Sequence, residues 1–365
     1  MSARSPQAPR TPASRLRRRE REHRRRSVEL MVTAIVILLG VAYATTQVDG
    51  SASAGDDRSS PSPSGGKVPA LLALSVTGAP KPLLAVVGAA GSPPAAMGVP
   101  QGLTLEVPGA GPLTTRQVAS LPGDGLQVAL SNVVGAWAAH HAVTDLEHLA
   151  VVVDREDGLP LELPEEVTLG TDVLGPGDVR MTGAQVAQYL GEENQNTFTR
   201  WEVVLAGLLA APPQLEPNDL TETDDVAGVQ ATLNGAKDGF IETLPVQVAA
   251  ATIRVPKYAE LDELMAERFG VKRIPVPVIV QNAVGTAGVG EAVGRMIIGH
   301  GFRITLSQNA ETFDQEETQI VALGEDNLRD ARRVRAALGV GHIAVSQVAS
   351  GIGDVQIIVG KDFTA

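Results

Sequence analysis

The spacing of hydrophobic residues predicts a region of mixed strands and helices between residues 68 and 211. Short apolar runs bounded by glycine or proline are typical of buried strands, and alternating runs are typical of half-buried strands. By these criteria we predict strands at 68–76, 82–88, 103–109, 149–154 and 159–164. Helical spacing predicts helices at 114–121, from Leu126 to about His141, at 182–190 with Thr182 as N-cap, and at 198–210. This region should fold as an α/β or α+β sandwich of layers.

The pattern of hydrophobic residues predicts strands and helices more clearly after residue 274. We predict strands at 275–282, 302–309, 318–324, 342–348 and 354–360, and helices at 285–301 and 325–339. The order is βαββαβ with a final strand, which predicts a small α/β unit at 274–365 with its helices on one sheet face.

A connector at 212–273 joins the two units. It opens with an acidic, proline-containing stretch, followed by predicted helices at 226–234 and 258–269. Residues 244–255 read as one strand or a pair of strands. Because isolated strands are unstable, we expect the connector to pack on the first unit rather than to stand apart.

The amino-terminal region has the pattern of a membrane anchor. An apolar stretch follows Arg24, Arg25 and Arg26, and it is long enough for one membrane crossing. The positive-inside rule puts the Arg-rich tail, 1–26, in the cytoplasm and the bulk of the chain outside. We therefore predict a transmembrane helix at 27–47 and a flexible Ser/Gly/Pro/Asp spacer at 48–67. A signal-peptidase site at Ala42-Tyr43-Ala44, which would release a secreted protein, is the alternative.

Charge and composition narrow the function classes. The chain has a net charge of −12, but residues 1–26 carry ten Arg and two Glu, which leaves −20 for residues 27–365. So acidic a body argues against nucleic acid as a partner, because that binding depends on neutralising phosphates. The absence of Cys excludes disulfides, thiolate metal sites and a cysteine nucleophile.

Two segments of the first unit resemble the LytR-CpsA-Psr family. MTGAQVAQYLGEENQNTFTRWEVVLAGLL (181–209) is similar to a family segment in which a Leu-x-Gly-x-x-Ala-x-x-Tyr helix precedes an Arg-rich stretch and an Asp-x-x-Arg-x-x-Arg-Gln helix. GVPQGLTLEVPGAG (98–111) resembles the family's Ile-Pro-Arg-Asp-Thr strand and the Pro-Gly turn after it. The resemblance implies a single-pass, outward-facing membrane protein. Family members transfer glycopolymers from a polyprenyl-pyrophosphate carrier to the cell wall, using arginines and acids around a Mg²⁺-bound pyrophosphate.

The departures from this family predict lost catalysis. The charged family positions are occupied here by Gln101, Gly102, Gly191, Thr197, Val203 and Val204, while Arg200 survives. Residues 82–211 hold four basic groups (Arg116, Arg155, Arg180, Arg200) against fifteen acids, a net charge of −11. A pyrophosphate requires several arranged cations, so we expect a degenerate, catalytically silent domain at 68–211 with no cofactor. Residual anion binding would fall to Arg200, Arg116 and Arg180, although Arg200 could equally be a surface residue paired with a nearby acid or stacked on Trp201.

The carboxy-terminal unit resembles the LytR C-terminal domain over 275–363. IVQNAVGTAGVGEAVGRMIIGHGF and the final IIVGKDF carry the resemblance, with Ala283 in place of the usual Gly. It implies an extracytoplasmic interaction or wall-binding module, whose contacts to a wall polymer or envelope protein we assign to Asn282, Arg329, Arg332 and Arg333. The same arginines could simply form a solvated face. Gly285, Gly288 and Gly290 lack the G-x-G-x-x-G spacing and the following acid of a dinucleotide site.

Two further groups of residues, a His/Asp set and paired carboxylates, do not predict a metal site or a catalytic pair. His141, Asp145 and His148 would share one face only if a helix continued through them, so we predict no metal site. The neighbouring carboxylates Glu165-Glu166 and Asp224-Asp225 are typical of solvated loops.

The sequence therefore favours a non-catalytic, membrane-anchored, extracytoplasmic cell-envelope protein. The alternative is an active glycopolymer transferase using Mg²⁺.

Overall fold

The computed structural model describes residues 70–90, 93–193, 195–250, 253–348 and 350–364. The predicted cytoplasmic tail (1–26), transmembrane helix (27–47) and spacer (48–67) lie outside these residues. Within the described part of the chain, no helix is long and apolar enough to cross a membrane.

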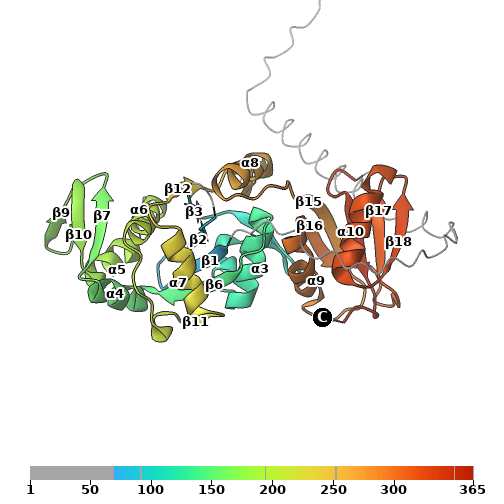
Figure 1. The fold of residues 1–365 in the computed structure, drawn as a ribbon, viewed down its shortest axis with the longest axis horizontal. Helices are drawn as coiled ribbons and strands as arrows, with labels where there is room; N and C mark the ends of the chain where they lie inside the picture. The colour runs from blue at the N-terminus through green and yellow to red at the C-terminus, as the bar shows by residue number, and fades with distance from the viewer. Residues whose placement is uncertain (1–69, 91–92, 194, 251–252, 349, 365) are drawn as a thin grey trace, which may run out of the picture.

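A six-stranded mixed sheet forms the centre of the first unit (Figure 1). Its strand order is β11-β6-β1-β2-β3-β12. The strands are β1 (Leu71–Thr77), β2 (Leu83–Gly88), β3 (Ala95–Val99), β6 (His140–Asp145), β11 (Glu222–Thr223) and β12 (Phe240–Thr243). Strands β1, β2 and β3 form an antiparallel meander, while β6 and β12 join parallel to β1 and β3.

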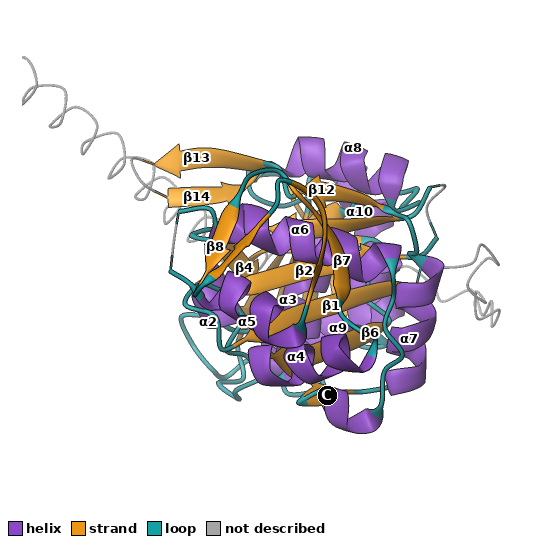
Figure 2. Cartoon of the chain, turned by 90° about the vertical axis from the view of Figure 1, so that its left-hand side faces the viewer, coloured by secondary structure: helices purple, strands orange, loops and turns teal. Residues whose placement is uncertain are grey.

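Helices cover both faces of this sheet because side chains of each strand alternate between the faces. Leu72, Leu74 and Val76 of β1 enter the core beneath α4 (Leu146–Arg155), α5 (Gly183–Gly191), α6 (Thr197–Ala210) and α7 (Val226–Gly235). Leu71 and Ala73 enter the opposite core beneath α3 (Gly123–Val134) and α8 (Tyr258–Arg268). Figure 2 shows α4, α5, α6 and α7 on the near side of the sheet.

Short elements surround these layers. Two-stranded ribbons pair β4 (Thr104–Val107) with β5 (Gly111–Thr114), β7 (Leu159–Leu163) with β10 (Gly177–Met181), β8 (Val167–Leu169) with β9 (Asp172–Leu174), and β13 (Val246–Ala250) with β14 (Ile253–Pro256). A single turn, α2 (Thr115–Val118), follows β5, and the 3₁₀ turn η1 (Pro217–Asp219) precedes β11.

Two of the predicted elements were wrong. The helix expected from Leu126 to about His141 ends at Val134, where Gly135 adopts a left-handed conformation (φ 68°) and caps it; residues 140–145 instead form strand β6. The strand expected at 149–154 lies inside helix α4, whose N-cap is Asp145. A short run rich in valine cannot be told from one face of a buried helix by periodicity alone.

Residues 212–273 are built into the first unit. They supply β11 and β12 at the two edges of the central sheet, α7 on one face and α8 on the other. The 244–255 segment forms the antiparallel pair β13–β14.

The carboxy-terminal unit contains a five-stranded sheet with the order β16-β15-β19-β17-β18. Its elements run β15 (Val276–Asn282), α9 (Val289–Ile297), η2 (Ile298–His300), β16 (Phe302–Asn309), β17 (Gln319–Leu323), η3 (Glu325–Asn327), α10 (Leu328–Leu338), β18 (His342–Ser346) and β19 (Val355–Val359). Both helices contribute to one core with alternate residues of the strands, so they lie on the same face of the sheet. This is the predicted order of elements.

The two units meet along the edge strand β16. The side chain of Asn132 in α3 is fully buried and pairs with the backbone of Ile304: its Nδ2 donates to the carbonyl oxygen (2.9 Å) and its Oδ1 accepts from the amide (2.7 Å). The Glu106 carboxylate accepts a hydrogen bond from the Ser307 amide at 2.6 Å. These side chains replace the missing neighbouring strand, so the edge is satisfied by the first unit.

Glycines bring the backbones close at this junction. A Cβ on Gly290 of α9 would lie 2.6 Å from the backbone of Gly109, in the turn after β4. A Cβ on Gly294, one turn later, would lie 3.0 Å from Pro108. The Ser307 hydroxyl accepts a hydrogen bond from the Gly109 amide at 2.8 Å, which fixes the same turn.

We predict that Gly290→Ala loosens the junction. The added methyl group meets rigid backbone, and overpacking of this kind costs about 1–3 kcal/mol. Urea unfolding of the purified protein should report the loss, and hydrogen exchange should localise it to 104–111 and 302–309. Gly299→Ala is the matched control, because its Cβ would have an ordinary 3.5 Å contact with Trp137. Equal stability of the two variants would contradict this packing.

Candidate functional site

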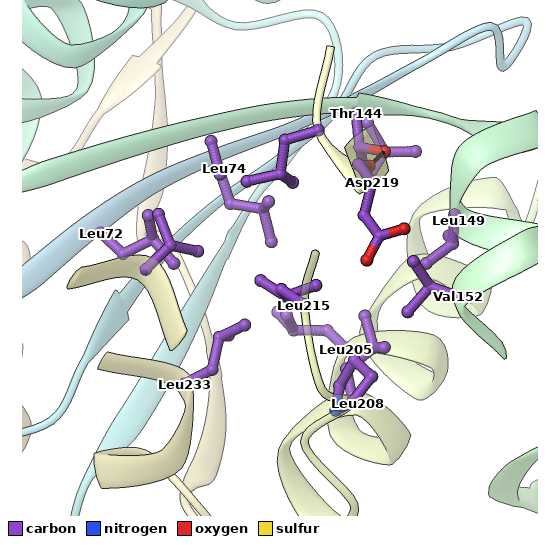
Figure 3. Close-up of a pocket in the computed structure, with 15 residues that line it drawn as sticks. Leu72, Leu74, Thr144, Leu149, Val152, Leu205, Leu208, Leu215, Asp219 and Leu233 are labelled. Atoms are coloured by element: carbon purple, nitrogen blue, oxygen red, sulfur yellow. Dashed lines mark hydrogen bonds between the residues drawn. The ribbon is translucent and has the colours of Figure 1, made fainter. Parts of the chain in front are cut away.

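An apolar cavity lies between the central sheet and the helices on its α4–α7 side (Figure 3). Strands β1 and β6 form its floor, and its lining consists mainly of leucine and valine side chains that converge on its centre. The lining residues include Leu72, Leu74, Leu149, Leu205, Leu208, Leu215 and Leu233. Its volume is about 50 Å³. Sites that enclose a drug-sized ligand have roughly 300–1,000 Å³, so these leucines already fill most of the space.

Among the described residues, Asp219 is the single ionisable residue in the lining of this cavity. It ends η1, where Thr144 of β6 donates a hydrogen bond to its carbonyl oxygen at 2.9 Å. Its side chain is 6% exposed and forms an ion pair with Arg155 at the end of α4. Its second carboxylate oxygen accepts a bond from the Glu216 amide at 2.6 Å.

The negative charge of Asp219 and the positive charge of Arg155 are therefore both compensated. Arg155 also forms an ion pair with Glu216 at 3.3 Å. A guanidinium that already binds two carboxylates has little capacity left for another anion. From the sequence, Arg155 is one of the four basic groups of residues 82–211, and Asp219 is one of several acids in the proline-containing stretch that opens the connector.

The three arginines predicted for anion binding form side-chain hydrogen bonds away from this cavity. Arg200 of α6 forms an ion pair with Glu192 at 3.0 Å, donates to the Tyr189 carbonyl oxygen and lies over the Tyr189 ring. Arg180 of β10 donates to the Gly158 carbonyl oxygen at 2.8 Å. Arg116 of α2 donates to the Pro80 carbonyl oxygen at 2.9 Å. Each arginine has its own partner, and none of these partners lines the cavity.

The positions that depart from the family motifs carry no charge in the structure. Gln101-Gly102 forms the turn between β3 and β4, and the Gly102 amide donates to the Thr115 hydroxyl at 3.1 Å. Val204 of α6 is fully buried in the core. The neighbouring Glu202 hydrogen-bonds to Thr243, and burial raises its pKa.

The three residues considered as metal ligands, His141, Asp145 and His148, do not lie on one helix face. His141 and Asp145 lie in strand β6, and His148 lies in α4. Hydrogen bonding to Asp145 at 2.9 Å raises the pKa of the exposed His148. Within the described ranges, no three His, Cys, Asp or Glu side chains come together so as to hold a metal ion. Glu166 is exposed in the loop after β7, whereas Asp224 accepts a hydrogen bond from the His141 amide at 3.1 Å.

In the carboxy-terminal unit, Asn282 has a structural role. It ends β15, and its Oδ1 accepts hydrogen bonds from the Val284 and Gly285 amides at 3.1 and 3.0 Å. Its Nδ2 donates to the Thr286 carbonyl oxygen at 2.8 Å. The side chain thereby fixes the loop that leads into α9.

The arginines of α10 face outward. Arg329 and Arg332 are exposed, and no salt bridge involves them within the described part of the chain. Arg333 forms an ion pair with Asp330 at 2.6 Å and donates to the His300 carbonyl oxygen.

Sequence reasoning missed a charged cluster at the junction of the two units. Arg303 of β16 is 4% exposed; it forms an ion pair with Asp262 of α8 at 2.6 Å and lies over the Tyr258 ring. Beside it, burial raises the pKa of Glu106 to about 7, and the hydrogen bond from the Ser307 amide lowers it only partly. The alternation at 103–109 places Glu106 on the polar side of β4, where the Ser307 amide of the second unit bonds to it.

Residues 275–363 match the model of the family described as LytR cell envelope-related transcriptional attenuator. This region is a LytR C-terminal domain. The resemblance of this region to the LytR C-terminal domain is confirmed. The comparison with curated proteins found no match.

Over the first unit the chain is similar to several solved structures. TagV of Bacillus subtilis is 10% identical, with a TM-score of 0.45 over 55% of this chain and 96% of that chain. The LytR-CPS2A-psr family protein YwtF (TagT) of B. subtilis with bound octaprenyl pyrophosphate lipid is 14% identical, with a TM-score of 0.45 over 56% of this chain and 92% of that chain. A transcriptional regulator from Enterococcus faecalis is 11% identical, with a TM-score of 0.43 over 55% of this chain and 87% of that chain.

We predict that Glu106 makes docking of the LytR C-terminal domain pH-dependent. Its pKa is raised from 4.5 to about 7 in the folded protein, so folding retains a proton that the unfolded chain releases. Its contribution is therefore fully present below about pH 4.5 and is lost as the pH rises through about 7.

Unfolding free energies measured between pH 5 and 8 test this prediction. Glu106→Gln keeps the acceptor for the Ser307 amide but cannot ionise, so its stability should fall less with rising pH than that of the wild type. Glu162→Gln, at an exposed position of β7, controls for the loss of one carboxylate. A Glu106→Gln profile parallel to the wild type would show that Glu106 titrates as in the unfolded chain.

Proposed function

We propose that the chain is a membrane-anchored, extracytoplasmic protein of the cell envelope whose first unit does not catalyse glycopolymer transfer. The match to a cell envelope-related family supports the setting. The apolar, Arg-flanked stretch at 27–47 supports the anchor, with the amino terminus in the cytoplasm. The domain boundaries of the sequence analysis, with 68–211 and 212–273 as one packed body and 274–365 as a second, belong to the same proposal.

The observation that carries the non-catalytic assignment is the compensated charge at the apolar cavity. A pyrophosphate leaving group requires cations aimed at it, and even one missing hydrogen-bond donor at such a site costs about 3 kcal/mol. Here the single ionisable lining residue is an acid, and its partner Arg155 also binds Glu216. Asp219 itself would repel the pyrophosphate.

The compact cavity supports the same proposal. A lipid tail has to displace side chains to enter a space of about 50 Å³ beneath α6 and α7. The surrounding leucines belong to the main core of the first unit, so opening the space would expose them to water.

An active transferase is the second candidate, and the apolar cavity itself favours it. YwtF (TagT) was solved with octaprenyl pyrophosphate, and another TagT structure is bound to LI-WTA. In this chain the cavity and Arg155 would have to hold such a carrier after Arg155 leaves Asp219. The residues present do not fit a Mg²⁺ held by carboxylates, because Asp219 is the only lining carboxylate and is already engaged.

We predict no micromolar binding of a polyprenyl-pyrophosphate analogue to the full chain in the presence of Mg²⁺. Isothermal titration in detergent would measure it, with transfer of carrier-linked polymer to peptidoglycan as the second readout. Arg200→Ala and Arg254→Ala are matched variants, one at the surviving motif position and one at an exposed position outside the motif. Micromolar binding that Arg200→Ala weakens tenfold or more, while Arg254→Ala leaves it unchanged, would establish the transferase instead.

A further inference from the structure

A group of cations gathers on the surface of the LytR C-terminal domain. We define it as the basic patch: Lys272, Arg273, Arg329, Arg332 and Arg333. All are exposed except Arg333, which is partly covered. The one salt bridge that involves any of them within the described residues joins Arg333 to Asp330. Five cations with one paired carboxylate contrast with a body whose net charge is −20 over residues 27–365.

The fold brings the patch together from two segments. A Cβ built on Gly301 would lie 3.0 Å from the Arg273 side chain and 3.6 Å from Nη2 of Arg333, so these two side chains flank one point. Arg329 and Arg332 occupy the solvent side of α10, opposite the buried Ala331, Val334 and Leu338. Lys272 and Arg273 belong to the segment between α8 and β15, which Figure 1 shows running from the first unit to the second.

The stability of the fold does not account for the charges of Arg329 and Arg332. Arg329 with Arg332, and Arg329 with Arg333, are like charges at i,i+3 and i,i+4, a spacing that destabilises a helix. Arg329 also lies in the first turn of α10, where the helix dipole disfavours a cation. Glu325 and Asp326, in η3 before the helix, suit that end instead.

The patch lies beside the point where the chain enters the fold. The Ala89 amide donates to the Ala70 carbonyl oxygen at 3.3 Å, and a Cβ on Gly270 would lie 3.6 Å from the Ala90 carbonyl oxygen. Lys272 follows Gly270 by two residues, which keeps it within about 10 Å of Gly270. Ile274, which follows Lys272 and Arg273 and precedes the buried Pro275, is an apolar side chain that is 74% exposed.

We propose that the basic patch binds the anionic phospholipid headgroups of the bilayer in which the chain is anchored, with Ile274 entering the interface. The orientation rests on the proposed anchor at 27–47. A flexible chain of twenty residues spans about 25 Å on average, so the spacer proposed at 48–67 would put the membrane within reach of the residues next to Ala70. Guanidinium groups bind phosphate oxygens in pairs, and cations beside an exposed apolar residue are typical of membrane-surface contacts.

Single-cysteine labelling tests the contact, because the chain has no cysteine of its own. Ala336→Cys puts a spin label on the exposed side of α10, and Val173→Cys puts one on β9 of the first unit, which is 60% exposed. The full-length protein is placed in nanodiscs of phosphatidylcholine alone or with phosphatidylglycerol. We expect the label at residue 336 to become immobilised and shielded from a water-soluble relaxation agent only with phosphatidylglycerol. The label at residue 173 should not change.

Charge reversal identifies the residues responsible. The triple variant Arg273→Glu, Arg329→Glu, Arg332→Glu should abolish the shielding, since each cation near an anionic surface contributes roughly fivefold to binding. Lys237→Glu, Arg254→Glu, Lys361→Glu makes the same change of charge at exposed positions outside the patch and should leave the shielding intact.

Three outcomes would overturn the proposal. Equal mobility and equal shielding of the label at residue 336 in both lipid compositions would show that the patch does not touch the membrane. Equal loss of shielding in the two triple variants would show that the contact depends on net charge alone and not on the basic patch. Arg-dependent binding of purified polyglycerol phosphate without any lipid effect would assign the patch to a wall polymer. Failure of the anchor is separately visible, because the chain would then be lost from the nanodisc fraction, and transferase activity has its own assay.

Discussion

The pairing of the Asn132 side chain with the backbone of Ile304 joins the two units of this molecule. A strand at the edge of a sheet exposes unpaired amides and carbonyls, and burying them without partners costs about 1–3 kcal/mol each. One amide side chain carries a donor and an acceptor in the same spacing as a peptide group, so Asn132 completes the ladder of β16. The Glu106 carboxylate does the same for the next free amide, at Ser307. The domain interface is therefore a continuation of hydrogen bonding within the sheet.

The interface between the two units explains the glycines of the loop and helix at 285–301. Gly290 and Gly294 permit α9 to approach Pro108 and Gly109, and Asn282 fixes the preceding loop. The motif that first suggests a nucleotide or a partner is directed inward, toward the first unit. Contacts to anything outside the molecule must therefore use other surfaces of the LytR C-terminal domain, and α10 is the helix that keeps a free polar face.

The sequence alone predicts those elements that are determined by neighbouring residues, such as helix caps and alternating strands. Thr182 caps α5, and the alternating strands of the carboxy-terminal sheet lie close to their predicted bounds. The valine-rich run at 149–154 was misread because only the neighbouring Asp145 cap and the tertiary core decide between strand and helix. Asn132 and Arg303 could not be recognised in advance, since their partners lie up to 172 residues away in sequence. The ion pair between Arg155 and Asp219 at the apolar cavity could not be predicted for the same reason, because the two residues lie far apart in sequence.

The distribution of positive charge connects these observations. In the first unit each candidate arginine is neutralised or bound near its own strand or helix: Arg200 by Glu192, Arg155 by Asp219, and Arg180 and Arg116 by backbone carbonyls. In the second unit Arg329 and Arg332 remain in solvent without a salt bridge in the described residues, on a helix that they do not stabilise. The exposed guanidinium groups of Arg329 and Arg332 are therefore available to an anion at the outward surface of the second unit. A phosphate-binding function retained by the chain would have its cations on α10 and the segment before β15, outside the apolar cavity.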